Sequence, residues 1–424
     1  MDAEVAGKLI MKLLVVSYAF PPWLSPRSIQ SERLLNHLSK KAYQITVITS
    51  CPDQIGVPLD EGLLGMLNPK IRLIRIADPR HRLVEYIKNH YPSLQKMPDT
   101  ANSWIPGAYR ACMEIVSDYD LLLTYSTPVS DHVLGYLIKR KYPRLPWVAF
   151  FSDPYVVNPF IQLSRFEKKI NEYLEKTIIA HADSIIFVND HTRLKTMERY
   201  HPSYFNKAIV IPHAFDETLY QKNQGKNDRL MIRHLGDFYG SRTPEPLLEA
   251  LSLLSEEKVG SLDRIVIEFY GKQNKAVEDI ISRYGLEDVV RYKGQVDYLK
   301  SLQLMSTSDV LLVIDSPSGE NLFLTSKVID YLGADIPILA ITPECGPTAE
   351  LMHSIGHTPY TFDDPAGIAR QISEYLDHKQ ARFTSSSIPG HIYARYRIDA
   401  IAREYCDLFE HLVSKSFPGV IRER

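Results

Sequence analysis

A loop in the second half of the chain combines glycines with an arginine. It runs from Gly236 to Arg242 after a short apolar segment and carries a second glycine, Gly240. Thr243 and Pro244 predict that a helix starts directly behind it, so free backbone N–H groups would lie beside the guanidinium group. A helix N-terminus next to an arginine is suited to binding a phosphate group. A routine loop with a solvated arginine is the alternative interpretation.

A second loop places a lysine where the helix dipole disfavours it. A helix is predicted to begin at Thr325 or Ser326 and to run to about Gly333, which puts Lys327 in its first turn. A cation at a helix N-terminus is explained if an anion binds there. Asp330 follows one turn later and could accept hydrogen bonds from ribose hydroxyls. A surface lysine and aspartate on an ordinary helix are the alternative.

Two shorter loops follow other apolar segments. Tyr270 and Gly271 end one such segment, and Gln295 and Val296 follow another. In open parallel sheets, ligands bind outside the carboxyl ends of the strands. These four residues are therefore candidates for contacts with a nucleotide base and ribose.

Short apolar segments that alternate with helical patterns must position these loops. In the first half they span 11–17, 45–49, 71–76, 120–124, 147–151, 184–188 and 208–211, and in the second half 230–235, 265–270, 290–293, 310–314 and 338–341. Continuous apolar strands separated by helices predict parallel sheets covered on both faces. The polar stretch 214–228 is the best candidate for a linker between two such domains. The loop-like stretch 382–390 leaves the last helical pattern, 398–412, free to pack outside its own domain.

Composition indicates a globular protein with more than one core. The 424 residues are 45% apolar and 24% charged, and 48.5 kDa exceeds what one ordinary core supports. There is no run of about 18 apolar residues to predict a transmembrane helix, and the first ten residues lack the pattern of a secretory signal. Four widely separated cysteines favour reduced thiols in a cytoplasmic protein.

Charge is uneven along the chain. Residues 1–215 hold 26 Lys+Arg and 20 Asp+Glu, a net charge of +6, whereas residues 216–424 hold the remaining 23 of 49 and 31 of 51, a net charge of −8. Basic residues of the first half gather at 70–82, 139–144 and 165–169. This pattern predicts attraction to an anionic surface or acceptor, with a merely solvated surface as the equal alternative. No nucleic-acid-binding motif is present, so nucleic acid is not an expected partner.

Short catalytic signatures of the common nucleotide and hydrolytic enzymes are absent from the sequence. Asp118-Tyr119-Asp120 matches a D-x-D signature that binds a metal and a diphosphate in one class of glycosyltransferases. It lies directly before an apolar segment, however, where a loop carboxylate is ordinary. We therefore predict no metal site and no required cofactor.

Several segments, in this order along the chain, are similar to one enzyme family. Tyr18–Trp23 resembles an aromatic-Pro-Pro signature, 211–216 an I-P-N-G-F-D segment, and 234–242 a diphosphate loop with a glycine and a cation. The most specific match is 326–340, which resembles the block S-K-x-x-E-Y-L-A-A-G-x-P-I-L-A. Pro98-Asp99, Trp104-Ile105-Pro106 and Ser152–Tyr155 resemble elements of a bacterial subgroup. The chain thus resembles the retaining glycosyltransferases of the GT-B fold, family 4.

The resemblance implies an α/β protein of GT-B type, with two doubly wound Rossmann-like domains facing a cleft. Residues 1–215 would bind the acceptor, residues 216–390 would bind a nucleotide-sugar, and the helix in 391–424 would cross back to the first domain. The implied reaction transfers a sugar from a nucleoside-diphosphate sugar to a glycan or lipid-linked acceptor in cell-surface polysaccharide assembly. A cytoplasmic enzyme on the inner face of the plasma membrane, with the anionic membrane surface as a further partner, is the expected setting.

The resemblance also assigns roles to residues. Arg242 and Lys327 would stabilise the charge of the leaving diphosphate, and Asp153 would act as the base, with Ser126 or Thr127 positioning the acceptor. Asp153 could equally be an ordinary loop cap before a proline. The expected donor-binding residues are Gly236, Tyr239, Gly240, Arg242, Tyr270, Gly271, Gln295, Val296, Thr325, Ser326, Lys327 and Asp330.

Three departures from the family pattern keep other functions open. The glycine pair of the first loop is replaced by Leu24–Arg27, and a histidine after the fourth strand is replaced by 125–127. In the E-x7-E motif, Asp330 holds the second position but Leu322 replaces the first glutamate, and Glu320 is the nearest carboxylate. The alternatives are a non-catalytic GT-B protein that binds a nucleotide-sugar or a partner enzyme, and a nucleotide-sugar hydrolase or 2-epimerase.

Overall fold

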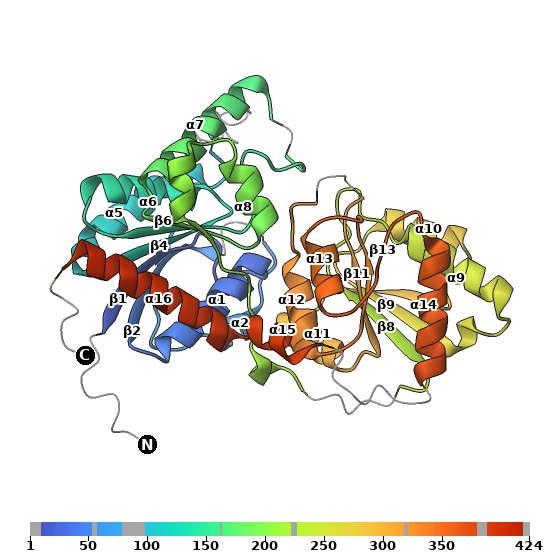
Figure 1. Cartoon of the computed structure of the whole chain (residues 1–424). Helices are drawn as coiled ribbons and strands as arrows, with labels where there is room; N and C mark the ends of the chain where they lie inside the picture. Colours follow the sequence, from blue (N-terminus) through green and yellow to red (C-terminus); the bar gives the residue numbers. More distant parts are fainter. Residues whose placement is uncertain are drawn as a thin grey trace, which may run out of the picture. The chain divides into compact units, whose positions relative to one another are not determined.

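The computed structural model of the chain describes residues 10–52, 57–78, 98–161, 163–221, 227–317, 321–379 and 388–418. The chain divides into two compact units, Met1–His213 together with Ile398–Arg424, and Ala214–Arg397. Within the described residues, each unit is built on one parallel sheet with helices on both faces (Figure 1).

The sheet of the first unit has seven strands in the order β3-β2-β1-β4-β5-β6-β7. The strands are β1 (Met11–Val16), β2 (Tyr43–Ser50), β3 (Arg72–Ile76), β4 (Leu121–Ser126), β5 (Trp147–Phe151), β6 (Ser184–Phe187) and β7 (Ala208–Val210). All neighbouring pairs are parallel. The strand order reverses between β1 and β4, so the loops after these two strands lead to opposite faces of the sheet.

The described helices of this unit are α1 (Pro26–Ser39), α2 (Glu61–Gly65), α5 (Ile105–Ile115), α6 (Ser130–Lys141), α7 (Arg165–His181), α8 (Asp190–Met197) and α16 (Ile398–Ser416). Successive residues of β4 show which helices cover each face. Thr124 Oγ1 lies 2.7 Å from His132 Nδ1 of α6, whereas the ring of Tyr125 lies beneath Arg27 of α1. On the α1 side, α16 packs along α1, and Phe409 meets the ring of Tyr43 (Figure 1).

The sheet of the second unit has six strands in the order β10-β9-β8-β11-β12-β13. The strands are β8 (Leu230–Leu235), β9 (Ile265–Tyr270), β10 (Val290–Gly294), β11 (Val310–Ile314), β12 (Ile338–Ile341) and β13 (Pro359–Tyr360). All pairs are again parallel. Here the order reverses between β8 and β11.

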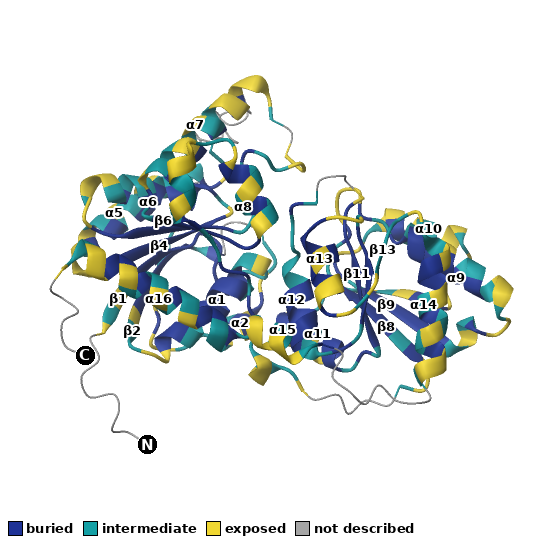
Figure 2. Ribbon diagram, in the orientation of Figure 1, coloured by how far each residue is buried: buried dark blue, intermediate teal, exposed yellow. Residues whose placement is uncertain are grey.

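The described helices of the second unit are α9 (Glu245–Glu257), α10 (Lys275–Arg283), α11 (Tyr298–Ser306), α12 (Ser326–Ala334), α13 (Pro347–Ser354), α14 (Pro365–His378) and α15 (Gly390–Arg395). Leucines and isoleucines of α9 and α14 pack with Ile232, Phe269 and Leu312 on one face of the sheet. Figure 2 shows both sheets buried between helices whose outward faces are exposed. Short 3-10 turns lie at Asn102–Trp104, Val116–Asp118, Pro202–Lys207, Glu217–Leu219 and Leu262–Arg264.

The prediction of two parallel, doubly wound sheets is confirmed, and most strand bounds agree within two residues. The start of α1 is also confirmed, because Ser25 caps it by accepting a hydrogen bond from Ser28 N–H at 3.1 Å. One helix start differs from the expectation, because the helix expected at Pro244 begins one residue later, at Glu245. The structure also adds the two-residue strand β13, which the sequence did not predict because Pro359-Tyr360 has no apolar run around it.

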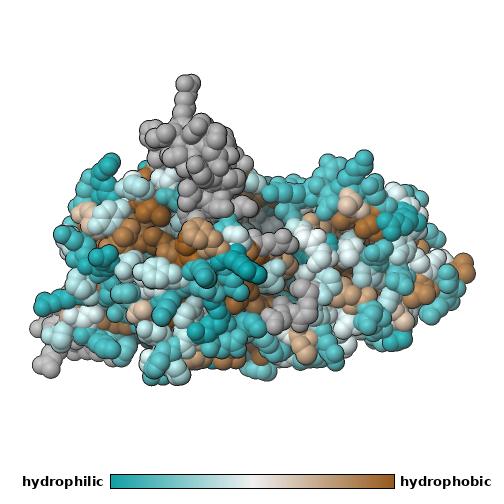
Figure 3. Space-filling model, turned by 90° about the horizontal axis from the view of Figure 1, so that it is seen from above, coloured by the Kyte–Doolittle hydropathy of each residue, from teal (hydrophilic) through white to brown (hydrophobic). Residues whose placement is uncertain are grey.

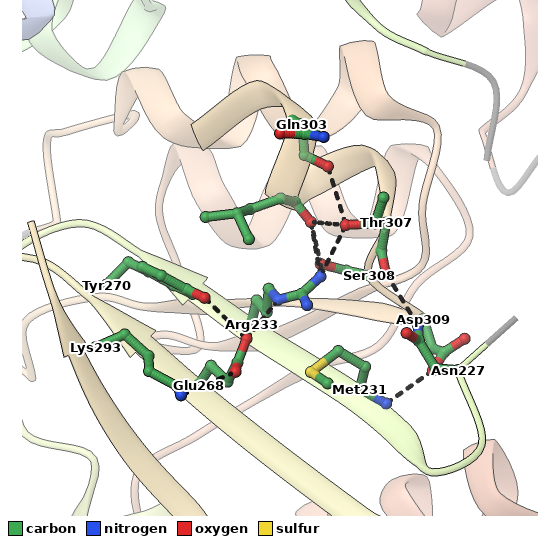
Figure 4. Close-up of polar contacts among 11 residues, drawn as sticks. Asn227, Met231, Arg233, Glu268, Tyr270, Lys293, Gln303, Thr307, Ser308 and Asp309 are labelled. Carbon is green, nitrogen blue, oxygen red and sulfur yellow. Dashed lines mark hydrogen bonds and ion pairs between the residues drawn. The ribbon is translucent and has the colours of Figure 1, made fainter. Parts of the chain in front are cut away.

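A buried ionic cluster ties β8 to β9 and to α11 (Figure 4). Arg233 Nε donates to Glu268 Oε2 at 2.8 Å, and the two side chains are only 9% and 11% exposed. Arg233 Nη1 donates to the carbonyl of Leu304 at 3.0 Å, and Tyr270 Oη donates to Glu268 Oε2 at 3.0 Å. The guanidinium group, the hydroxyl of Tyr270 and the ammonium group of Lys293 lower the pKa of Glu268. Because Arg233 and Glu268 are both nearly buried, removing either side chain would leave the charge of the other poorly compensated.

We predict that Glu268→Ala lowers the stability of the second unit by about 3 kcal/mol, because Arg233 then loses its only carboxylate among the described residues. Urea unfolding followed by far-UV circular dichroism measures the loss. Glu256→Ala, on the exposed side of α9, is the matched control and should leave the midpoint unchanged. Tryptophan fluorescence should not follow the change, since Trp23, Trp104 and Trp147 all belong to the first unit. Equal effects of both variants would contradict the prediction.

Candidate active site

The candidate site lies at the carboxyl edge of the second sheet, where the strand order reverses between β8 and β11. The loop after β8 begins with Gly236, whose φ of 145° is open to glycine but rarely to other residues. A β-carbon there would lie 2.6 Å from Lys327 Cε and closer still to Nζ. Glycine at this position thus lets the lysine of α12 extend across the loop. The neighbouring loop crowds it too, since a β-carbon at Gly271 would lie 2.8 Å from the carbonyl oxygen of Gly236.

A neutral histidine lies beneath the lysine. His234 is fully buried, and its Nδ1 is 3.0 Å from the carbonyl oxygen of Leu312. Because a carbonyl can only accept, Nδ1 carries the proton and Nε2 is left as an acceptor, 3.4 Å from Lys327 Nζ. Burial and the nearby lysine hold the pKa of His234 well below its usual value. The ring therefore orients the ammonium group without adding charge.

The arginine of the same loop keeps unused hydrogen-bonding capacity. The side chain of Arg242 is 5% exposed and lies over the ring of Tyr239, at 4.3 Å from the centroid. Its Nη2 is 4.0 Å from Asp315 Oδ1, which is a long contact. Within the described residues, Arg242 Nε and Asp315 Oδ1 are buried and have no hydrogen-bond partner. A buried donor without a partner is unfavourable, and a bound anion would supply the missing acceptor.

The two cations raise the local potential together. Burial and the positive charge of Arg242 lower the pKa of Lys327 to about 7, while the carboxylates of Asp315 and Asp237 oppose this shift. Asp315 Oδ2 accepts from Thr342 Oγ1 at 2.9 Å and from Asn321 Nδ2 at 3.1 Å, and its Oδ1 makes only the long contact of 4.0 Å with Arg242. Within the described residues, neither cation therefore has a close ion-pair partner.

The start of α12 adds donors to the same place. Thr325 is the residue before the helix, and its side chain does not cap the first turn; its hydroxyl oxygen is buried without a partner in the part of the chain that is described. The first turn, which includes Ser326 and Lys327, holds no acidic residue. At the start of α9, by contrast, Thr243 Oγ1 accepts from Glu245 N–H at 3.2 Å. The N-terminus of α12 thus keeps N–H groups for an anion.

Two other residues expected to contact a nucleotide form hydrogen bonds with side chains of the protein. Asp330 Oδ1 accepts hydrogen bonds from the hydroxyls of Tyr220 at 2.8 Å and Tyr298 at 3.4 Å. The hydroxyl of Tyr270 donates to Glu268 in the ionic cluster of Figure 4. Their roles toward a nucleotide stay predictions.

The remaining expected residues lie around the loop without joining the two cations. Gly240 has a φ of 62° and open space around it. Gln295 is exposed and Val296 half-buried, directly after the end of β10. The carbonyl of Gly294 accepts from Gly271 N–H at 3.1 Å, which holds these two loops together.

Two side chains of the site were not singled out from the sequence. His234 was noted only as part of a segment, since a histidine inside a strand gives no signal of the face to which it points. Asp315 directly follows the buried strand β11, and this carboxyl-end position could have identified it. Ser316 Oγ lies 2.6 Å from Ser241 Oγ and so joins the loops after β11 and β8.

The corresponding edge of the first unit also carries an arginine. Arg27, in the first turn of α1, donates through Nη2 to the carbonyl of Ser126 and to Ser152 Oγ. Ser152 Oγ in turn lies 3.0 Å from Asp153 Oδ2. Burial raises the pKa of Asp153, and Arg27 opposes this shift. Ser126 and Asp153, both expected at the acceptor end, thus lie at neighbouring strand ends.

The segments that resemble a bacterial subgroup, and the D-x-D segment, make contacts within the first unit. Asp99 Oδ2 accepts from Ser130 N–H at 2.8 Å, at the start of α6. Trp104 is fully buried, and its ring meets that of Tyr18 with centroids 5.3 Å apart. Asp120 Oδ2 accepts from Lys12 N–H at 2.7 Å, at the amino end of β4. Across the described ranges, no three His, Cys, Asp or Glu side chains gather as metal ligands would. Glu320 lies outside the described residues.

Comparison with known proteins places the fold. No protein-family model and no curated relative matches the sequence. Sucrose-phosphate synthase from Thermosynechococcus elongatus superposes with a TM-score of 0.70 at 15% identity, over 96% of this chain and 100% of that one. The chain has the GT-B fold. The lipopolysaccharide outer core galactosyltransferase WaaB gives 0.60 at 11% identity, over 95% and 100% of the two chains.

A GT-B protein of another activity is about equally similar. UDP-GlcNAc 2-epimerase from Neisseria meningitidis, solved with bound UDP-GlcNAc, gives a TM-score of 0.58 at 13% identity, over 95% of this chain and 100% of that one. Identities of this size show the fold alone. The expectation of two Rossmann-like units is thus confirmed, while the choice between transferase and epimerase depends on the site.

We predict that Lys327 titrates near pH 7 in the free protein, because burial and Arg242 lower its pKa. In Arg242→Gln the Lys327 pKa should rise, since the repelling charge is gone. NMR of the protein with ¹³C-labelled lysine measures both titrations. A Lys327 signal that moves only above about pH 10 would contradict the prediction.

Proposed function

We propose that this protein is a retaining glycosyltransferase that moves a sugar from a nucleoside-diphosphate sugar to a glycan or lipid-linked acceptor. The observation that carries the proposal is the convergence of Lys327, Arg242 and the uncapped start of α12 at the reversal point of the second sheet. This is the position where open parallel sheets bind ligands, and its donors suit a diphosphate.

In this proposal the second unit binds the donor and stabilises its leaving group. Negative charge develops on the diphosphate as the bond to the sugar breaks. Lys327 Nζ, the unpartnered Nε of Arg242 and the N–H groups of α12 are fixed before reaction, so they favour that charge with little rearrangement. Gly236 leaves room for the lysine beside the loop.

The acceptor is assigned to the first unit. Asp153 has a raised pKa, which suits a group that takes a proton from an acceptor hydroxyl. Ser152 and Arg27 hold this carboxylate at the end of β5. Retention of configuration and a sugar acceptor follow from the resemblance to family 4.

A second candidate is a GT-B protein that binds a nucleotide-sugar without transferring it, or a hydrolase or 2-epimerase acting on it. Two observations favour this candidate. Asp330, at the second position of the E-x7-E motif, is engaged by Tyr220 and Tyr298, and Leu322 at the first position is 6% exposed. The similarity to a 2-epimerase is of the same order as that to the transferases.

We predict that one nucleoside diphosphate among UDP, GDP, ADP and dTDP raises the melting temperature of the wild-type protein. Arg242→Ala and Lys327→Ala should each weaken its binding by at least about tenfold, because a charge-assisted hydrogen bond to phosphate is lost. Lys272→Ala is the matched control and should bind as the wild type does. A panel without any shift, or full binding by both variants, would reject the donor site.

Product analysis then separates the two candidates. Incubation of the matching nucleotide-sugar without acceptor should leave it intact if the protein is a transferase. Release of free sugar or formation of an epimer would favour the second candidate, as would binding without turnover in the presence of a range of glycan and lipid-linked acceptors.

We predict that diphosphate binding takes up a proton at pH 8. The pKa of Lys327 is about 7 in the free protein, so its amine is mostly neutral at pH 8; a bound anion stabilises the ammonium form and raises the pKa. Isothermal titration calorimetry in buffers of different ionisation enthalpy measures the uptake. It should approach one proton at pH 8, fall toward zero at pH 6, and vanish in Lys327→Met. Uptake by that variant would contradict the assignment.

A further inference from the structure

Two acidic side chains of helix α7 in the first unit are buried against the rest of the unit. Glu167 is buried in a capping box, where its Oε2 accepts from Ser164 N–H at 2.7 Å. The side chain of Glu175 is fully buried; it accepts from Arg199 Nη1 at 2.9 Å and from Tyr200 Oη at 2.6 Å. Two of the three glutamates of the helix therefore point inward. The third, Glu172, is partly exposed and lies 3.4 Å from Arg199.

The outward side of the same helix is basic and aromatic. Arg165, Lys169 and Lys176 are exposed and lie on the side of the helix that carries Phe166 and Tyr173, because each residue turns the helix by about 100°. Lys169 and Lys176 form no ion pair within the described residues. Between these cations lie Phe166, 62% exposed, and Tyr173, 68% exposed. The two rings lie about two turns apart on the same side of the helix, so they form an apolar strip beside the cations.

The loop before α7 continues this surface. Phe160 and Ile161 are 40% and 46% exposed. Figure 3 views the molecule from above and shows hydrophobic patches among hydrophilic residues on the described surface. The α7 surface is defined here as Ile161, Arg165, Phe166, Lys169, Tyr173 and Lys176. No described helix is long and apolar enough to cross a membrane.

We propose that the α7 surface docks on a bilayer that contains anionic lipids. Lysines meet the negative headgroups, while Phe166, Tyr173 and Ile161 enter the boundary between headgroups and acyl chains. A soluble polyanion would engage the lysines but leave the apolar side chains in water. The interleaving of both kinds of residue is therefore what favours a lipid surface.

The position of α7 connects this surface with the acceptor. The helix follows β5 and leads back to the start of β6, which is parallel to β5, so its first turn lies on the side of the carboxyl ends of the strands. Asp153 begins the same connection. Docking would bring this edge of the first unit to the lipid surface, and the acceptor would then be lipid-linked; this last step alone rests on the proposed function.

Flotation with vesicles tests the proposal at low salt. The wild-type protein should float with phosphatidylcholine vesicles containing about 30% phosphatidylglycerol and stay behind with pure phosphatidylcholine. Lys169→Glu with Lys176→Glu should lower the affinity by about tenfold or more. Lys40→Glu with Lys41→Glu is the control of equal charge change; this exposed pair lies between α1 and β2, at the opposite edge of the sheet, and should alter binding less than about twofold.

A third variant tests the apolar part. Phe166→Ser with Tyr173→Ser keeps every charge and should also reduce flotation, which distinguishes interfacial docking from mere adsorption of cations. Failure of the wild type to float, equal flotation with neutral vesicles, equal loss in the control pair, or no effect of the serine variant would each overturn the proposal. The nucleotide-induced melting shift should persist in all three variants, so its absence would count against the proposed function and not against docking.

Discussion

The reversal of strand order between β8 and β11 is the constraint on which the candidate site depends. Neighbouring parallel strands whose connections leave toward opposite faces keep a crevice open at their carboxyl ends. Arg242 enters it from the loop after β8, Asp315 from the end of β11, and Lys327 from the helix that follows. The first unit repeats the arrangement, since Arg27 from the first turn of α1 reaches the end of β4 at Ser126.

Within that crevice the protein leaves its charges incompletely balanced. Asp315 accepts hydrogen bonds from Thr342 and Asn321 and lies 4.0 Å from Arg242, while burial and the positive charge of Arg242 lower the pKa of Lys327. The ionic cluster of Arg233 and Glu268, on β8 and β9 of the same sheet, shows the opposite arrangement, because both Nε and Nη1 of the arginine have hydrogen-bond partners. The paired groups of the ionic cluster stabilise the fold. At the candidate site, buried polar groups lack partners, so a ligand that supplies those partners would bind favourably.

The net charge of each half of the chain does not predict the local charge at its candidate binding surface. Residues 216–424 carry a net charge of −8, yet this part of the chain holds the cationic crevice, because short-range geometry outweighs distant and solvent-screened carboxylates. In the first unit the net charge of +6 becomes informative only once α7 is folded. Glu167 and Glu175 then turn inward, and the lysines and aromatic rings remain at the surface.

Local patterns in the sequence determined the strands, the cap of α1 by Ser25 and the start of α12 near Thr325, because apolar runs and capping residues act over a few positions. They also singled out the glycines and cations of the two main loops. The tertiary structure alone decided that His234 lies beneath Lys327, 93 residues away, and that tyrosine hydroxyls engage Asp330. Such pairs depend on strand order and on the face to which each side chain points, which no short segment specifies.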